Sequence, residues 1–310
     1  MPNPVGELYA AGGQSQSRAR DDGQSEELMD QLPTSAVIIV LAWTALAVAL
    51  GGYLLARRGV RIAGRSRIEP PANFGNLLIL FFIVAGVWIG IPSFLGSMRG
   101  KELSTVEMVS VGAVSNLVGI LVFFIGNGAM RRGGMGGLRM AEGGIRRGIG
   151  WGVVGLLLIE PLIFWSGVLT EWFYRKYGIE HPGAHEMLEV LGSSHKLWFQ
   201  ALIVVTAVVL APIFEEILFR GLIQTLIGQG RTGIQTPENR PSVGRAWLAI
   251  FLSALLFASV HEPWTMPPIF VLALCLGYAY ERTGNLWTSI TMHALFNLVS
   301  VVQYQWLMIH

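Results

Sequence analysis

The chain has 310 residues, of which 52% are hydrophobic and only 14% are charged. Soluble domains carry about 25% charged residues, so this composition excludes an ordinary soluble domain and indicates a polytopic membrane protein. The net charge of +2 is too small to suggest nucleic acid as a partner, and a single cysteine, Cys275, excludes a disulfide framework and a thiolate metal cluster.

The first residues are polar and acidic, with no basic segment followed by an apolar core, so we expect no cleavable signal peptide and predict a disordered tail over residues 1–35. Apolar runs follow, several of them near the ~20 residues that a membrane-spanning helix needs. We therefore predict an all-α polytopic transmembrane helix bundle of about eight membrane segments. The runs lie at about 36–55, 77–94, 108–125, 149–169, 197–227, 246–260, 268–280 and 286–309.

Basic residues are concentrated in every second connection between these runs. They follow the first, third, fifth and seventh runs, whereas the connection around Glu171 to Glu189 is acidic. Because positively charged loops stay in the cytoplasm, we expect these four connections to be cytoplasmic and both termini to be outside. The excess of Arg over Lys favours a bacterial plasma membrane.

Two glycine pairs have the spacing typical of close helix packing, Gly86-x-x-x-Gly90 and Gly148-x-x-x-Gly152. The sixth and seventh runs are shorter than a full span, and the turn that joins them, residues 261–268, contains three prolines. Non-helical backbone at membrane depth is tolerated where it lines a cavity, so this turn predicts a cavity among the C-terminal helices. We expect N-terminal transmembrane helices over residues 36–195 and a catalytic helical core over residues 196–310.

The fifth run contains Glu215, Glu216 and Arg220 within an otherwise apolar stretch. Ionisable groups inside a membrane are costly and therefore functional candidates. Glu216 and Arg220 are i,i+4 neighbours that can form an ion pair, while Glu215 lies about 100° round the helix and has no local counter-charge. In a soluble protein, a helix-surface pair with one solvated Glu would explain the same residues.

Later runs supply Phe257-x-x-x-His261 and His293-x-x-x-Asn297, and the second spacing places His293 and Asn297 on one helix face. These groups suit hydrolysis of an amide by water. Glu215 would act as general base with His261 holding the water, and His293 with Asn297 would stabilise the oxyanion. Zinc is the competing assignment for Glu and His, and the favoured mechanism requires no cofactor.

The sequence lacks the characteristic residues of other protease classes. No Asp follows Asp30, which excludes a membrane aspartyl dyad within this chain, and neither a Gly-x-Ser-Gly site nor a His-Glu-x-x-His zinc motif occurs. Glu160, which precedes Pro161 in the fourth run, is a further intramembrane carboxylate. We interpret it mainly as packing at a helix break, with the side chain turned to the bundle interior, and direct participation in the site is the alternative.

The ordered set Glu215-Glu216-x-x-x-Arg220, Phe257-x-x-x-His261 and His293-x-x-x-Asn297 resembles the type II CAAX prenyl endopeptidase family, also called the CPBP or ABI intramembrane protease family, which includes bacteriocin-immunity relatives. The resemblance covers about residues 197–300. It implies an intramembrane endopeptidase in which Glu215 and His261 activate water, and His293 and Asn297 form the oxyanion site.

We therefore expect hydrolysis of a peptide bond in a membrane-associated peptide or protein, with or without a lipid, and the bilayer as the surroundings. Glu216 and Arg220 would brace the helix and tune the site. The alternative is a non-enzymatic membrane scaffold or immunity factor whose polar groups bind a partner peptide. No sequence feature specifies an oligomeric state.

Overall fold

The computed structural model describes most of the chain after residue 33. The predicted tail falls outside the described residues except for residues 34 and 35, which begin a helix. The chain divides into two compact units, residues 1–50 and 51–310, and each is described by itself. The described ranges are 34–58, 68–69, 74–99, 103–135, 137–138, 140–141, 143–180, 186–194, 196–229 and 243–309.

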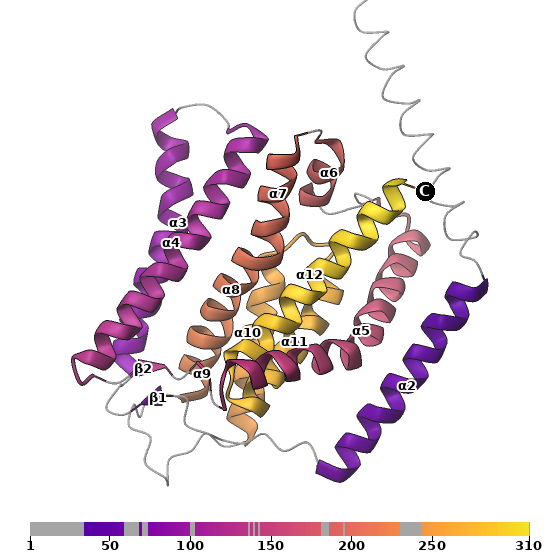
Figure 1. Ribbon diagram of the computed structural model, residues 1–310, viewed down its shortest axis with the longest axis horizontal. Helices are drawn as coiled ribbons and strands as arrows, with labels where there is room; N and C mark the ends of the chain where they lie inside the picture. The colour runs from indigo at the N-terminus through magenta and orange to yellow at the C-terminus, as the bar shows by residue number, and fades with distance from the viewer. Residues whose placement is uncertain are drawn as a thin grey trace, which may run out of the picture. The chain divides into compact units, whose positions relative to one another are not determined.

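Helices account for nearly all of the described residues (Figure 1). Two dipeptide strands pair with each other, and two short segments are π-helical and carry the label η. The elements in chain order are α2 (Thr34–Arg58), β1 (Ile68–Glu69), α3 (Phe74–Arg99), α4 (Thr105–Arg132), β2 (Gly137–Leu138), α5 (Ile145–Lys176), α6 (Glu186–Ser193), α7 (Leu197–Val205), η1 (Thr206–Leu210), α8 (Ala211–Glu216), η2 (Ile217–Gln224), α9 (Thr225–Gln229), α10 (Val243–Ser259), α11 (Met266–Thr283) and α12 (Leu286–Ile309).

Each predicted apolar run falls on helical structure, and the fifth run corresponds to the uninterrupted succession from α7 to α9. Five helices of the described chain are long and apolar enough to cross a membrane. The sixth run becomes α10, which is apolar but has only 17 residues, as its short run predicted. The prediction of an all-α polytopic bundle is confirmed. The five spans are Val37–Leu54, Phe74–Met98, Thr105–Arg132, Ile145–Lys176 and Leu197–Gly228.

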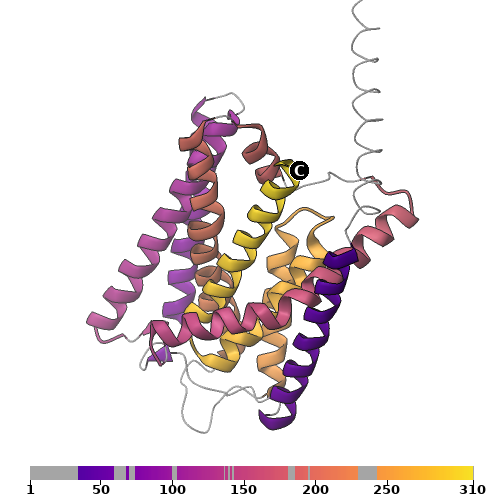
Figure 2. The same ribbon diagram turned by 45° about the vertical axis from the view of Figure 1, so that its right-hand side comes forward.

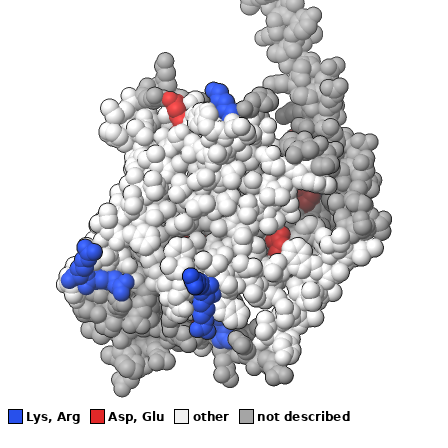
Figure 3. All heavy atoms as spheres, in the orientation of Figure 1, with Lys and Arg blue, Asp and Glu red and all other residues white. Residues whose placement is uncertain are grey.

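Three of the connections predicted to lie on one side of the membrane contact one another in the second unit. Strand β1, after the first run, pairs antiparallel with β2, after the third. Ala141 forms a bridge with Asn285, after the seventh run, and Asn285 Nδ2 donates to Gly144 O at 2.9 Å. Figure 3 shows Lys and Arg side chains at the lower edge of one face and a broad, largely uncharged band above them. That these connections lie on the cytoplasmic side of the membrane stays a prediction.

One of the two glycine pairs lies at a close helix contact. Helices α5 and α12 lie side by side (Figure 1 and Figure 2), and a Cβ atom on Gly152 would be 2.5 Å from Thr291 Cβ. On Gly148 it would be 2.6 Å from Asn285 Oδ1. Nothing in the described chain lies within 4 Å of such an atom on Gly86 or Gly90, so this pair makes no close helix contact there.

We expect Gly152→Ala to lower the free energy of unfolding by about 1–3 kcal/mol, the usual effect of overpacking. The added methyl group would also lie 2.9 Å from the backbone oxygen of Thr288, which cannot rotate away. The matched control is Gly150→Ala on the same helix, where nothing described lies within 4 Å. Denaturant titration of the purified protein should show a loss for the first variant alone, and equal midpoints would contradict this packing.

Candidate active site

The fifth run is one helical succession with two π-helical interruptions. Pro212, which has no N–H for the helical ladder, lies near the start of the short helix α8. The π-helical segment η1 ends two residues before Pro212, and α8 lies between η1 and η2. Single π turns inside α-helices occur frequently at functional sites. The two predicted carboxylates, Glu215 and Glu216, end α8 between these turns.

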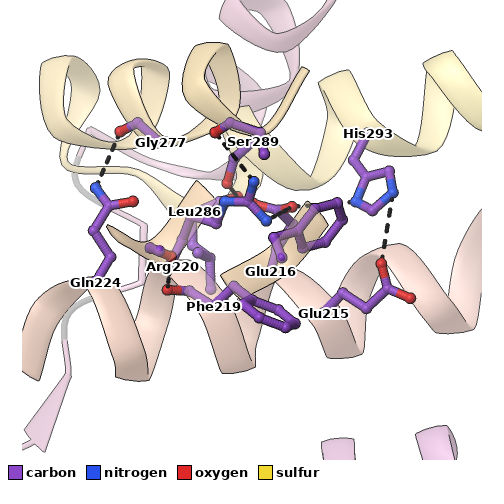
Figure 4. A network of polar contacts seen from close by, with 12 residues as sticks. Glu215, Glu216, Phe219, Arg220, Gln224, Gly277, Leu286, Ser289 and His293 are labelled. Atoms are coloured by element: carbon purple, nitrogen blue, oxygen red, sulfur yellow. Dashed lines mark hydrogen bonds and ion pairs between the residues drawn. The ribbon is translucent and has the colours of Figure 1, made fainter. Parts of the chain in front are cut away.

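His293 of α12 lies between the two carboxylates of α8 (Figure 4). Its Nδ1 is 3.1 Å from Glu216 Oε1, and its Nε2 is 3.7 Å from Glu215 Oε2. A carboxylate only accepts hydrogen bonds, so Nδ1 donates to an ionised Glu216, and in the neutral ring Nε2 keeps a lone pair. The side chain of Glu215 is 23% exposed and that of Glu216 is 0% exposed. Only Glu215 is therefore accessible to a small molecule.

The i,i+4 ion pair predicted from the sequence is present and fully buried. Arg220 Nη1 donates to Glu216 Oε1 at 2.8 Å, and Arg220 is 1% exposed. A second guanidinium nitrogen, Nη2, donates to Ala273 O of α11 at 3.2 Å. The guanidinium carbon also lies 4.5 Å from the centre of the Phe257 ring. The pair thus links α8 and η2 to α11.

The ring of Phe257 on α10 contacts a residue from each of the three sequence motifs. Its ring centre is 4.8 Å from the ring of His261, 5.6 Å from that of His293 and 5.0 Å from that of Phe219. His261 is half-buried in the turn after α10, and its Nδ1 lies 2.7 Å from Phe257 O. A carbonyl oxygen only accepts, so Nδ1 donates and Nε2 of neutral His261 is an acceptor. Such a nitrogen can accept a hydrogen bond from water.

Asn297, one helical turn after His293, bonds to the backbone of η1. Its Nδ2 donates to Ala207 O at 2.8 Å. Positions 207 and 215 would point about 80° apart in an ideal α-helix. A π turn takes up about one extra residue, which brings the two positions onto one face. The π segment therefore lets a single face of α12 reach both Ala207 and Glu215. An amide carries two hydrogens, and Asn297 uses one of them here.

Three polar side chains that support this site were not identified from the sequence. Ser253 Oγ donates to Phe219 O at 2.9 Å, and Gln224 Nε2 donates to Gly277 O at 3.1 Å and to Glu281 Oε1 at 3.0 Å. All three are buried. A sequence signal was available for two of them, because Ser253 and Gln224 are polar residues in apolar runs, and Gln224 follows Arg220 at i+4 spacing. Glu281 directly follows the seventh run.

Glu160 points into the packed interior, as predicted. The expected helix break at Pro161 was wrong, because α5 continues through this residue, and Glu160 is buried between Leu156 and Ile163 on the same face. Its Oε2 atom has no hydrogen-bond partner in the described part of the chain. Ile163 packs with residues of α11 and α12. Whether Glu160 participates in the site directly stays a prediction.

Zinc was the open alternative for Glu215, His261 and His293. A zinc site places its ligand atoms about 2.0–2.3 Å from one metal ion. Over the ranges that the structure describes, no group of three or more His, Cys, Asp or Glu side chains is arranged to hold a metal ion. The side chains as placed do not fit such a site, and no step below uses a metal.

Comparisons with known proteins bear on the same region. A sequence model of the family described as type II CAAX prenyl endopeptidase Rce1-like matches residues 197–299. The chain is similar to UPF0177 protein YaiF of Lactococcus lactis subsp. lactis (strain IL1403), with 27% identity over 155 residues that cover 46% of this chain and 62% of that protein. No solved structure matches. Residues 197–299 of this integral membrane protein are therefore similar to the Rce1-like type II CAAX prenyl endopeptidase family.

Proposed function

We propose that this protein is an intramembrane endopeptidase that hydrolyses a peptide bond of a membrane-associated substrate with water activated by Glu215. The observation that carries the proposal is the position of His293 between Glu215 and Glu216 inside the Rce1-like domain, at 3.7 Å and 3.1 Å. The family is a protease family, which favours peptide hydrolysis over the alternative of a non-enzymatic scaffold.

Glu215 is the general base of the proposed reaction. A single water molecule can contact both Glu215 Oε2 and His293 Nε2, because these atoms are 3.7 Å apart. The Glu215 carboxylate takes one proton from this water, and the oxygen attacks the carbonyl carbon of the scissile bond. His261 Nε2, an acceptor because Nδ1 donates to Phe257 O, helps to hold the same water. The partial exposure of Glu215 supports this assignment over the fully buried Glu216.

His293 and Asn297 are the proposed donors to the oxyanion of the tetrahedral intermediate. Asn297 has a second amide hydrogen beyond the one that it gives to Ala207 O. His293 can donate from Nε2 only as an imidazolium, because its Nδ1–H is already directed to Glu216. Two carboxylates flank that ring. Glu216 thus orients His293 through the Nδ1–H group.

The second half of the reaction returns the proton. The carbon–nitrogen bond of the tetrahedral intermediate breaks, and the leaving amine takes the proton that Glu215 received from water. The products are a new carboxyl terminus and a new amino terminus, and Glu215 is again ionised. The substrate approaches from the side of Glu215, the accessible one of the two carboxylates. A membrane-associated peptide, with or without a lipid, suits a site within transmembrane helices.

The test uses the purified protein in liposomes with a library of membrane-anchored peptides, each made with and without a prenyl group on its cysteine. Mass spectrometry should detect cleavage products with the unmodified protein and none with His261→Ala. Unchanged products from His261→Ala, or no products from either protein, would contradict the proposal. Comparison of the two peptide sets identifies whether the lipid is part of what is recognised.

A chelator arm of the same assay tests the metal alternative. If Glu215 and His261 activate the water directly, prolonged incubation with a strong chelator should leave the cleavage rate within about twofold of the untreated rate. A loss that zinc addition restores would show that a metal performs the step assigned here to Glu215.

A further inference from the structure

The residue directly before Glu215 is anchored on helices that lie outside the Rce1-like domain. Phe214 is fully buried, and its ring centre is 5.2 Å from that of Trp88 on α3. A Cβ atom on Gly119 of α4 would overlap Cε2 of the Phe214 ring and would lie 2.9 Å from its Cδ2. Phe214 therefore packs directly on the backbone of α4. Only glycine at position 119 leaves room for its ring.

Trp88 and α4 are themselves fixed to each other. Trp88 Nε1 donates to Asn116 Oδ1 at 3.1 Å, and Asn116 lies three residues before Gly119, on the same face of α4. Asn116 is buried and Trp88 is half-buried, and the hydrogen bond between them fixes the position of the indole ring. The indole of Trp88 and the backbone of Gly119 form the surface on which the Phe214 ring packs, and we call this surface the Phe214 seat.

The rotation of α8 depends on such anchors. Helix α8 has six residues and lies between η1 and η2, so regular α-helical hydrogen bonding does not continue on either side of it. The Phe214 seat holds one side of α8, and the contacts of Glu216 with Arg220 and His293 hold the other. Phe214 and Glu215 are adjacent, so their directions differ by a fixed angle of about 100°. A fixed Phe214 therefore fixes the direction of Glu215.

We infer that the α3–α4 pair positions the Glu215 carboxylate. The positioning residues are Trp88 and Gly119 on this pair and Phe214 on α8. This assigns a function to N-terminal helices that the family match, residues 197–299, does not include. The inference rests on the proposed function, because it assigns these residues to the alignment of the general base. A misplacement of about 1 Å by a residue far from the reacting atoms can lower a rate by about 100-fold.

The test compares two alanine substitutions on α4. Gly119→Ala should lower kcat by about 10- to 100-fold with KM changed less than about threefold, because it displaces Phe214 and turns Glu215 without altering substrate contacts. Gly112→Ala is the matched control, since nothing described lies within 4 Å of its added methyl group, and it should leave both constants unchanged. Adding Phe214→Leu to Gly119→Ala makes room for the methyl group and should restore most of kcat.

A readout that needs no substrate separates this inference from the proposed function. Nitrogen NMR of the histidine-labelled protein in nanodiscs, assigned with His293→Gln, reports the surroundings of the His293 ring, and Glu215→Gln calibrates the shift that loss of the carboxylate causes. Gly119→Ala should shift these resonances, and Gly112→Ala should not. If no peptide is cleaved but the shifts follow this pattern, the proposed function fails and the positioning stands. If Gly119→Ala leaves the His293 resonances unchanged, or if Phe214→Leu fails to reverse its effect, the positioning inference is overturned.

Discussion

Arg220→Met should lower the free energy of unfolding by about 3–5 kcal/mol, because it leaves Glu216 as a buried carboxylate without its cation. The pair is 2.8 Å apart with side chains 1% and 0% exposed, so water cannot replace the lost partner. The substitution also removes the hydrogen bond from Nη2 to Ala273 O and the contact with the Phe257 ring. Equilibrium unfolding of the purified protein in detergent measures the loss.

The chain contains a matched control for this prediction. Glu171 and Arg175 form an ion pair with the same i,i+4 spacing and a shorter distance, 2.6 Å, but their side chains are 33% and 45% exposed. Arg175→Met should therefore cost no more than about 0.5 kcal/mol. Glu216→Gln in the Arg220→Met background removes the orphaned charge and should recover at least half of the loss. Equal losses for the two arginine variants would contradict the assignment of a buried, structural pair.

Local periodicity was sufficient to predict part of this site. The spacing of Glu216 and Arg220 predicted their ion pair, and the spacing of His293 and Asn297 predicted that both lie on one face of their helix. Both predictions depend only on the geometry of a regular helix. The apolar runs predicted the helices for the same reason, because each spanning segment must satisfy its backbone hydrogen bonds internally.

The contacts that depend on the π segments could not be predicted in this way. The hydrogen bond from Asn297 to Ala207 O needs the extra residue of η1, which changes the face that follows it, and no residue type marks a π turn in the sequence. The contact of His293 with both carboxylates also depends on how α8 is rotated. Helical spacing offers Glu215 no local counter-charge, and the structure places the His293 ring beside it.

The contacts of single glycines with side chains that are distant in the sequence also could not be predicted from the sequence. The chain has 38 glycines, and Gly119 is not distinguished among them until Phe214 is seen to lie against it. Gly86 and Gly90 have the spacing of a packing motif but make no close contact in the described chain, because they lie on an exposed face of α3. Spacing alone therefore identifies which residues can pack closely, and the arrangement of the helices decides which of them do.

Glu215→Gln should lower the rate of peptide hydrolysis by about 10²–10⁴-fold, the range expected for loss of a general base. Glutamine has the size of glutamate but cannot take a proton from water, so the geometry is kept and the chemistry is lost. The free energy of unfolding should stay the same or rise, because the substitution removes one of two neighbouring carboxylates from a largely buried position. This variant thus separates catalysis from folding, in contrast to Arg220→Met.

The most direct test of Glu215 as the base is the single-turnover cleavage rate of a peptide that the unmodified protein cleaves, measured with Glu215→Gln in parallel. Glu171→Gln, at a partly exposed site, is the control for loss of a negative charge. We predict a rate at least about 100-fold lower for Glu215→Gln at unchanged unfolding stability, and an unchanged rate for Glu171→Gln. A Glu215→Gln protein that is folded and cleaves the peptide at the original rate would contradict the account.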